Sequence, residues 1–190
     1  MTDGNFVKFQ WFDAYVLLMR LHQIITGSRN KGRNNISFLN SLGSLYIVYG
    51  RGRNIVVLDK DLLQVNLIPD AIGADSGEIT CICCDNLTGL AAVSDGRKIV
   101  VFETAGALAS KATWREFCEL CPDDMVTALG WFPHSSICRK PLLLVASSST
   151  SSSPDAHHHI TGWQITWPHA GEKNEISDIW ERLWTVESNG

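Results

Sequence analysis

The chain has 190 residues, of which 45% are hydrophobic and 19% charged, and this ordinary globular composition excludes an intrinsically disordered protein. Its formal net charge of −4 excludes a general nucleic-acid-binding surface, because neutralising phosphates requires an excess of basic residues. Six cysteines without a secretory signal favour reduced thiols in a cytosolic compartment.

We interpret residues 1–18 as an N-terminal extension that precedes the folded domain. The first apolar stretch of the chain is interrupted by Lys8, Asp13 and Arg20. It therefore lacks the roughly 20 uninterrupted apolar residues that a membrane-spanning helix needs. We expect any membrane contact to be peripheral.

An internal repeat is the strongest signal in the rest of the sequence. The segment Gly52–Asp59 returns 44 positions later as Gly96–Glu103, and in both copies a glycine and a basic residue lead into an apolar run that ends in an acid. A period of roughly 40–45 residues built from strand-like units is that of a four-stranded propeller blade. The repeat therefore predicts a binding scaffold made of β-strands.

Three cycles of four strand-length apolar runs follow one another along the chain. The first strand of each cycle has a hydroxyl residue at its second position, and we expect it to lie between neighbouring blades, buried on both faces. The segment 113–120 is compatible with a strand or with a short helix. The predicted strands are 36–39, 46–49, 54–59 and 62–68, then 79–82, 90–93, 98–103 and 113–120, then 126–129, 142–145, 160–167 and 180–186.

The predicted fold class is all-β, a partial WD-repeat β-propeller of about three four-stranded blades. Residues 19–190 form an incomplete propeller domain, in which 21–26 is an outer strand without preceding inner strands. Fewer than four blades do not close a ring, so we expect exposed inter-blade faces and an aggregation-prone isolated chain. The predicted blades lie at about 35–68, 78–120 and 125–186, and the serine- and histidine-rich segment 147–159 is expected to be a flexible loop.

Two short segments predict the hairpin corners between the second and third strands. Asp95-Gly96 is typical of a type I′ turn, because both residues tolerate the positive φ that this turn demands. Gly50-Arg51-Gly52 occupies the same corner one blade earlier.

The spacing of Cys118, Cys121, His134 and Cys138 matches a zinc-finger pattern with cysteine as the fourth ligand. A ββα finger needs a helix that leads into the histidine, whereas residues 126–133 are strand-like and end in proline. We therefore favour unligated loop or core thiols, and a zinc-binding domain is kept as an alternative. No metal site and no cofactor is predicted.

The sequence contains no motif for nucleophilic catalysis or phosphate binding, and we predict no catalytic residue and no small-molecule substrate. Three consecutive histidines, 157–159, lie beside the expected loop and cannot form a preorganised metal site. The tryptophans on inner strands, 131, 163 and 167, are expected to fill space between blades. Trp180 and Trp184 lie on an outer strand, and Trp184 is the candidate interface anchor.

The run Met19–Gly27, which reads Met-Arg-Leu-His-Gln-Ile-Ile-Thr-Gly, resembles the beginning of proteins of the DmX-like or rabconnectin-3 family. The resemblance continues through Tyr49-Gly50 with Asn54–Leu58 and through Ile68-Pro69 into Ile79-Thr80-Cys81, and it fades after about residue 135. The blades depart from a standard WD repeat, because Leu58-Asp59, Phe102-Glu103 and Trp167-Pro168 stand in place of the Trp-Asp dipeptide.

The resemblance implies an N-terminal fragment of the large WD-repeat subunit of the RAVE complex, which regulates the vacuolar proton-transporting ATPase. It implies a noncatalytic scaffold that binds the peripheral sector of this ATPase and other RAVE-type subunits. Such a protein would be cytoplasmic and would reach endosomal, vacuolar or vesicle membranes through its partners. The alternative is a generic WD-repeat adaptor in vesicle trafficking or ubiquitin pathways.

Overall fold

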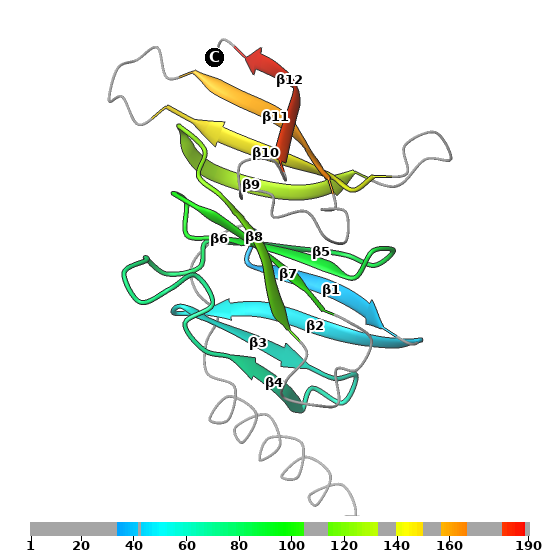
Figure 1. The fold of residues 1–190 in the computed structure, drawn as a ribbon. Helices are drawn as coiled ribbons and strands as arrows, with labels where there is room; N and C mark the ends of the chain where they lie inside the picture. The colour runs from blue at the N-terminus through cyan, green and yellow to red at the C-terminus, as the bar shows by residue number, and fades with distance from the viewer. Residues whose placement is uncertain are drawn as a thin grey trace, which may run out of the picture.

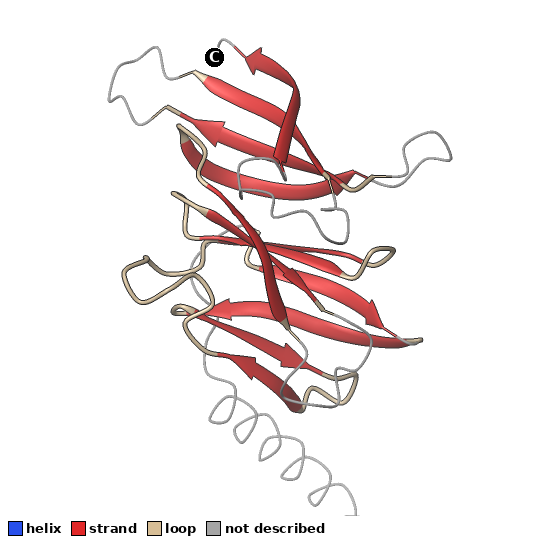
Figure 2. Cartoon of the chain, in the orientation of Figure 1, coloured by secondary structure: helices blue, strands red, loops and turns tan. Residues whose placement is uncertain are grey.

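The computed structural model describes residues 34–41, 43–104, 114–132, 140–149, 157–166 and 180–188. These residues form twelve β-strands in three four-stranded antiparallel sheets, which are stacked on one another (Figure 1). Figure 2 shows strands joined by loops throughout this described part of the chain. The prediction of an all-β fold with the architecture of a partial WD-repeat propeller is therefore confirmed.

Within each sheet, every strand pairs with its neighbour in the sequence. The segment 113–120, whose sequence is compatible with a strand or with a short helix, contains the strand β8 (Arg115–Leu120). Sheet 1 contains β1 (Ile36–Ser41), β2 (Ser44–Arg51), β3 (Asn54–Leu58) and β4 (Gln64–Ile68), sheet 2 contains β5 (Cys81–Asp85), β6 (Leu90–Ser94), β7 (Ile99–Glu103) and β8 (Arg115–Leu120), and sheet 3 contains β9 (Met125–Phe132), β10 (Leu142–Ser148), β11 (His158–Ile165) and β12 (Trp180–Ser188).

The first strands of the three sheets lie against one another, β1 on β5 and β5 on β9. Sheet 2 therefore lies between the other two sheets (Figure 1). Residues on β6 and β7 are almost all buried, which explains why both strands are continuous apolar runs rather than alternating ones. The layer between sheets 1 and 2 includes Leu39, Val48, Val57, Ile82 and Val93, and the layer between sheets 2 and 3 includes Ala92, Val101, Cys118, Leu143 and Val145.

The expectation that every first strand is buried on both faces is wrong for the two end sheets. In β1, the side chains of Ile36 and Phe38 are 46% and 55% exposed, and in β9 those of Met125 and Phe132 are each 47% exposed. Only sheet 2 has a described sheet on both of its sides. The end sheets therefore keep one apolar face that no described sheet covers.

The expected type I′ turn at Asp95-Gly96 is also wrong. Gly96 has a φ of +98°, but Asp95 does not have a positive φ, and the connection contains four residues between the paired Ser94 and Ile99. The Asp95 carboxylate accepts hydrogen bonds from the backbone N–H groups of Arg97 and Lys98, at 2.9 and 3.0 Å, and so stabilises this longer turn.

The corresponding corner of sheet 1 is a two-residue turn, because Arg51 pairs with Asn54 and Gly52 adopts a φ of +58°. Similar sequences therefore form different turns, and the carboxylate of Asp95 accounts for the difference.

The serine- and histidine-rich segment contributes more strand than we expected. Ser147 and Ser148 belong to β10 and pair with His159 and His158 of β11, so the expected loop 147–159 is too long at both ends. Backbone pairing in the hairpin satisfies the peptide groups whatever the polarity of the side chains, and it extends the strands into the polar segment. Residues 150–156 lie outside the described residues, as do the extension 1–18, the orphan strand 21–26 and Trp167.

The described part of the chain contains no helix that is long and apolar enough to cross a membrane.

Candidate binding groove

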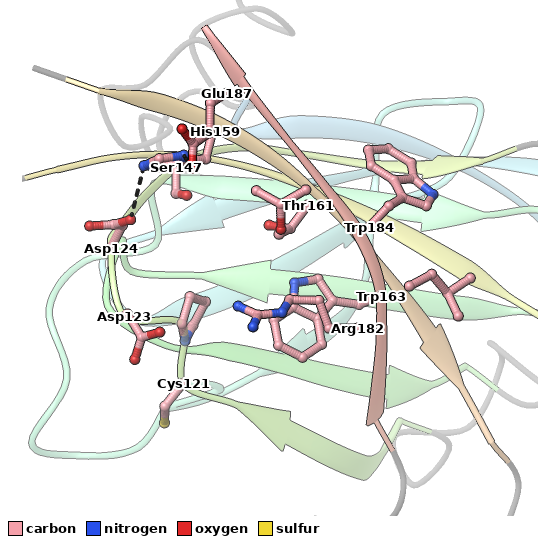
Figure 3. Close-up of a pocket in the computed structure, with 13 residues that line it drawn as sticks. Cys121, Asp123, Asp124, Ser147, His159, Thr161, Trp163, Arg182, Trp184 and Glu187 are labelled. Carbon is pink, nitrogen blue, oxygen red and sulfur yellow. Dashed lines mark ion pairs between the residues drawn. The ribbon is translucent and has the colours of Figure 1, made fainter. Parts of the chain in front are cut away.

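A groove of about 760 Å³ lies between sheet 3 and the segment Cys121–Asp124, which connects β8 to β9 (Figure 3). One wall is this connection, and the other is formed by side chains of β10, β11 and β12. The volume lies within the range of about 300–1,000 Å³ that is typical of ligand sites.

The strand register explains why polar side chains gather at this place. Ser147 pairs with His159, and His159 pairs with Glu187, so the three side chains lie on one face of sheet 3. Two and four residues before Ser147, Val145 and Leu143 lie on this same face and are fully buried against sheet 2. The face that forms the core therefore becomes polar at its edge, where it lines the groove.

A register shift in β11 and β12 completes this wall. The pairing changes between Gly162 and Trp163, so that Trp163 lies opposite Arg182. The Arg182 guanidinium lies 5.9 Å from the centroid of the Trp163 ring, which is the geometry of a cation–π contact. Trp180 packs edge-on against Trp163 at 6.4 Å and donates a hydrogen bond to the carbonyl oxygen of Glu119 at 3.1 Å. This wall is therefore attached to sheet 2 through β8.

His159 lies between two carboxylates. Its Nε2 atom is 3.6 Å from Oδ2 of Asp124, and its Nδ1 atom is 3.9 Å from Oε1 of Glu187. Figure 3 shows Asp124 reaching this ring from the connection that forms the opposite wall. The Nδ1 atom is buried without a hydrogen-bond partner, and so is the Nε1 atom of Trp163. The groove therefore has hydrogen-bonding capacity that the described residues do not use.

Histidine, serine and carboxylates occur together in the groove. A nucleophilic serine needs a hydrogen bond to its base, and among the described residues none joins the Ser147 hydroxyl to His159. The Nε2 atom of His159 instead faces Asp124. What the arrangement supports is binding through charge, aromatic surface and hydrogen bonds.

The structure describes two of the four residues of the possible zinc pattern, Cys118 and Cys121. Cys118 is buried in the layer between sheets 2 and 3, and this burial, together with the nearby Glu116, raises the pKa of its thiol to about 12. Cys121 lines the groove and donates a hydrogen bond to Glu119. Zinc binds the thiolate, which burial of Cys118 disfavours. His134 and Cys138 lie outside the described residues, and no group of three potential metal ligands occurs within the described ranges.

The cysteines of β5 are core residues. Cys81 and Cys83 are buried, and Cys84 is partly buried and packs against the core. Burial raises the pKa of all three thiols, to about 12 for Cys84. These thiols therefore stay protonated at neutral pH and act as small apolar side chains.

Of the predicted aromatic positions, Trp131 fills space between sheets 2 and 3 and donates a hydrogen bond to the carbonyl oxygen of Cys83 at 3.2 Å. Trp184, the candidate anchor, is 40% exposed. A Cβ atom added at Gly162 would lie 2.6 Å from the Trp184 ring, so this ring covers the glycine. Whether Trp184 anchors a partner stays a prediction.

Sequence reasoning singled out His159 and Cys121 but missed Asp123, Asp124 and Arg182. The register shift moves Arg182 to the face of Trp163, and simple alternation along β12 does not reveal this placement. The two aspartates precede the first strand of the third sheet, and their only sequence signal is a pair of acids after a proline.

The fold places the chain in a class of protein: three stacked, four-stranded antiparallel sheets form part of a WD-repeat type of propeller. The chain is 29% identical over 127 residues to DmX-like protein 1 of Homo sapiens, and the matched region is 62% of this chain. It is also 29% identical over 124 residues to DmX-like protein 1 of Mus musculus, which covers 60% of this chain. The matches span 4% of the length of each relative, and no family model matches. These similarities agree with the resemblance to the DmX-like family.

Proposed function

We propose that this chain is part of a noncatalytic WD-repeat scaffold of the RAVE or rabconnectin-3 type, which promotes assembly of the vacuolar proton-transporting ATPase and hence acidification of organelles. The observation that carries the proposal is the similarity to DmX-like protein 1 over 62% of the chain. The stacked sheets add a second support, since propellers commonly provide rigid surfaces for protein contacts.

The partners in this proposal are the peripheral sector of the ATPase and other RAVE-type subunits. We propose that the protein is cytoplasmic and reaches endosomal, vacuolar or vesicle membranes through these partners. Because the chain spans 4% of the length of the relatives it matches, the activity of the whole protein belongs to the proposal.

The test is to tag the protein at its own locus, to capture it, and to measure whether subunits of the ATPase peripheral sector are recovered with it. We expect these subunits to be enriched over a capture from untagged cells. Loss of the gene should raise the pH inside acidic organelles, measured with a ratiometric luminal dye. Normal acidification in the null cells would overturn the proposal. Recovery of trafficking or ubiquitin components without ATPase subunits would instead support the alternative of a generic WD-repeat adaptor.

A further inference from the structure

We propose that the groove between sheet 3 and Cys121–Asp124 binds an extended segment of a partner protein that carries basic side chains. This inference deepens the proposed protein-binding role and rests on it, but it does not depend on which assembly the partner belongs to. It rests on the charge of the groove, on its unused hydrogen-bonding groups and on the strand that forms its outer edge.

The charge of the groove favours a cationic partner. Among the described lining residues, Asp123, Asp124 and Glu187 carry negative charge, whereas Arg182 is the single arginine or lysine. The guanidinium of Arg182 lies over the Trp163 ring. The carboxylate of Asp124 lies beside the Nε2 atom of His159, and that of Glu187 lies beside its Nδ1 atom. The negative potential of the two carboxylates is therefore strongest around His159. A lysine or arginine of a partner is attracted to this point, and a phosphate group is repelled.

The groove also contains polar groups that lack partners. Ser147 is only 6% exposed and lines the groove. The Nε1 atom of Trp163 and the Nδ1 atom of His159 are buried without a hydrogen-bond partner. A buried polar group without a partner destabilises the site, and a ligand that supplies the partner recovers part of this cost. This capacity distinguishes the groove from a solvated acidic surface.

The edge of sheet 3 favours an extended segment over other shapes. β12 is the last strand of its sheet and, within the described chain, pairs with β11 alone. It has nine residues, and those from Glu181 to Glu187 are all exposed. An edge strand presents unpaired N–H and C=O groups to which an extended segment can add as a further strand. Every second side chain of such a segment then points toward the face that carries Thr185 and Glu187.

The experiment uses the protein captured on beads through a tag at its own locus, and a fluorescent peptide of alternating lysine and threonine with the length of β12. We expect saturable binding of this peptide and at least tenfold weaker binding of a peptide in which glutamate replaces lysine. Substitution of Glu187→Gln or Asp124→Asn should weaken binding of the lysine peptide about fivefold, because each removes one groove carboxylate.

The matched control variants are Glu78→Gln and Asp75→Asn, which make the same chemical changes at exposed positions outside the groove. We expect both controls to bind the lysine peptide as the unmodified protein does. Equal weakening by the groove and control variants would show nonspecific attraction and would overturn the proposal, as would the absence of binding. Glu187 is 67% exposed, so its substitution leaves the fold intact.

A second peptide tests strand addition separately. N-methylation of alternate backbone amides removes strand hydrogen bonds but keeps the charge, and we expect it to weaken binding about tenfold. Unchanged affinity would overturn the role of the β12 edge. The peptide experiments measure binding to the groove only. A negative result in them is therefore distinguishable from a failure to recover ATPase subunits or to change organelle pH.

Discussion

At the scale of single residues, Gly50 shows how closely sheets 1 and 2 approach each other. Its backbone N–H donates to the Oδ1 atom of Asn35 at 3.1 Å, and the Nδ2 group of Asn35 donates to the carbonyl oxygen of Gly50 at 3.3 Å. A Cβ atom at this position would lie 2.6 Å from Cγ2 of Ile79, in the segment that leads into sheet 2. The glycine is therefore needed for packing rather than for an unusual backbone conformation.

We predict that Gly50→Ala lowers the free energy of unfolding by about 1–3 kcal/mol, because the added methyl group must displace Ile79 and the Asn35 amide. Denaturant unfolding followed by tryptophan fluorescence, at a concentration below the micromolar range in which we expect association, measures the change. The matched control is Gly130→Ala on β9, where an added Cβ meets no atom within 4 Å, and we expect a change below about 0.5 kcal/mol. Equal effects of the two substitutions would contradict this account of the contact between sheets 1 and 2.

At the scale of elements, Asp95 joins the turn between β6 and β7 to the segment that enters sheet 2. Its carboxylate accepts hydrogen bonds from Arg97 and Lys98 within the turn and from the N–H of Gly77 at 3.1 Å. Burial alone would raise the pKa of Asp95, but these backbone donors outweigh burial and lower it. The charged form of Asp95 therefore stabilises the native connection.

We predict that Asp95→Ala lowers the free energy of unfolding by about 1 kcal/mol at pH 7, as expected when a half-buried carboxylate that accepts backbone hydrogen bonds is lost. The folded-state pKa lies below the unfolded value of about 3.9, so the contribution of Asp95 is fully present above that value and is lost as the pH falls through the folded-state pKa. The difference between variant and parent should therefore shrink below about pH 4, as measured by unfolding at several pH values.

The control for this prediction is Asp61→Ala, at an exposed turn carboxylate of sheet 1, which we expect to change stability by less than about 0.5 kcal/mol at pH 7. A difference between Asp95→Ala and its parent that stays constant down to acidic pH would show that the charge of Asp95 is not what stabilises the turn.

The strands were predictable from the sequence because their signals are local. The apolar runs of β6 and β7 and the repeat around Gly52 and Gly96 are properties of neighbouring residues. The groove was not predictable, because Asp124 and Glu187 are far apart in the sequence. Folding brings both of them to the two nitrogen atoms of His159. Cys118 and Cys121 belong to one spacing motif, but Cys118 is buried in the core and Cys121 is exposed just after the end of β8. The spacing in the sequence does not reveal this difference in burial.

At the scale of the whole molecule, the outer face of sheet 3 lacks a described sheet against it. Ile160 and Val186 pair directly across β11 and β12 and are 48% and 58% exposed, and Phe132 lies on the same face. By alternation, this face is opposite to the one that carries Ser147, His159 and Glu187. Closed propellers cover such faces with further blades, typically four to eight in all. The three described sheets therefore leave an apolar surface of the kind that associates in solution.

We predict that the isolated chain aggregates at micromolar concentration and that the double substitution Ile160→Lys with Val186→Glu reduces this association at least severalfold, as measured by light scattering. The two new charges lie opposite each other on paired strands, so they attract each other and do not disturb the core. The control is the double substitution Leu63→Lys with Leu87→Glu. These two leucines lie in the loops between strands and are 59% and 72% exposed. This control should leave aggregation unchanged, because these side chains lie outside the sheet face. A parent chain that stays soluble and monomeric at micromolar concentration would contradict the prediction, and equal improvement by both double variants would show that surface charge alone is responsible.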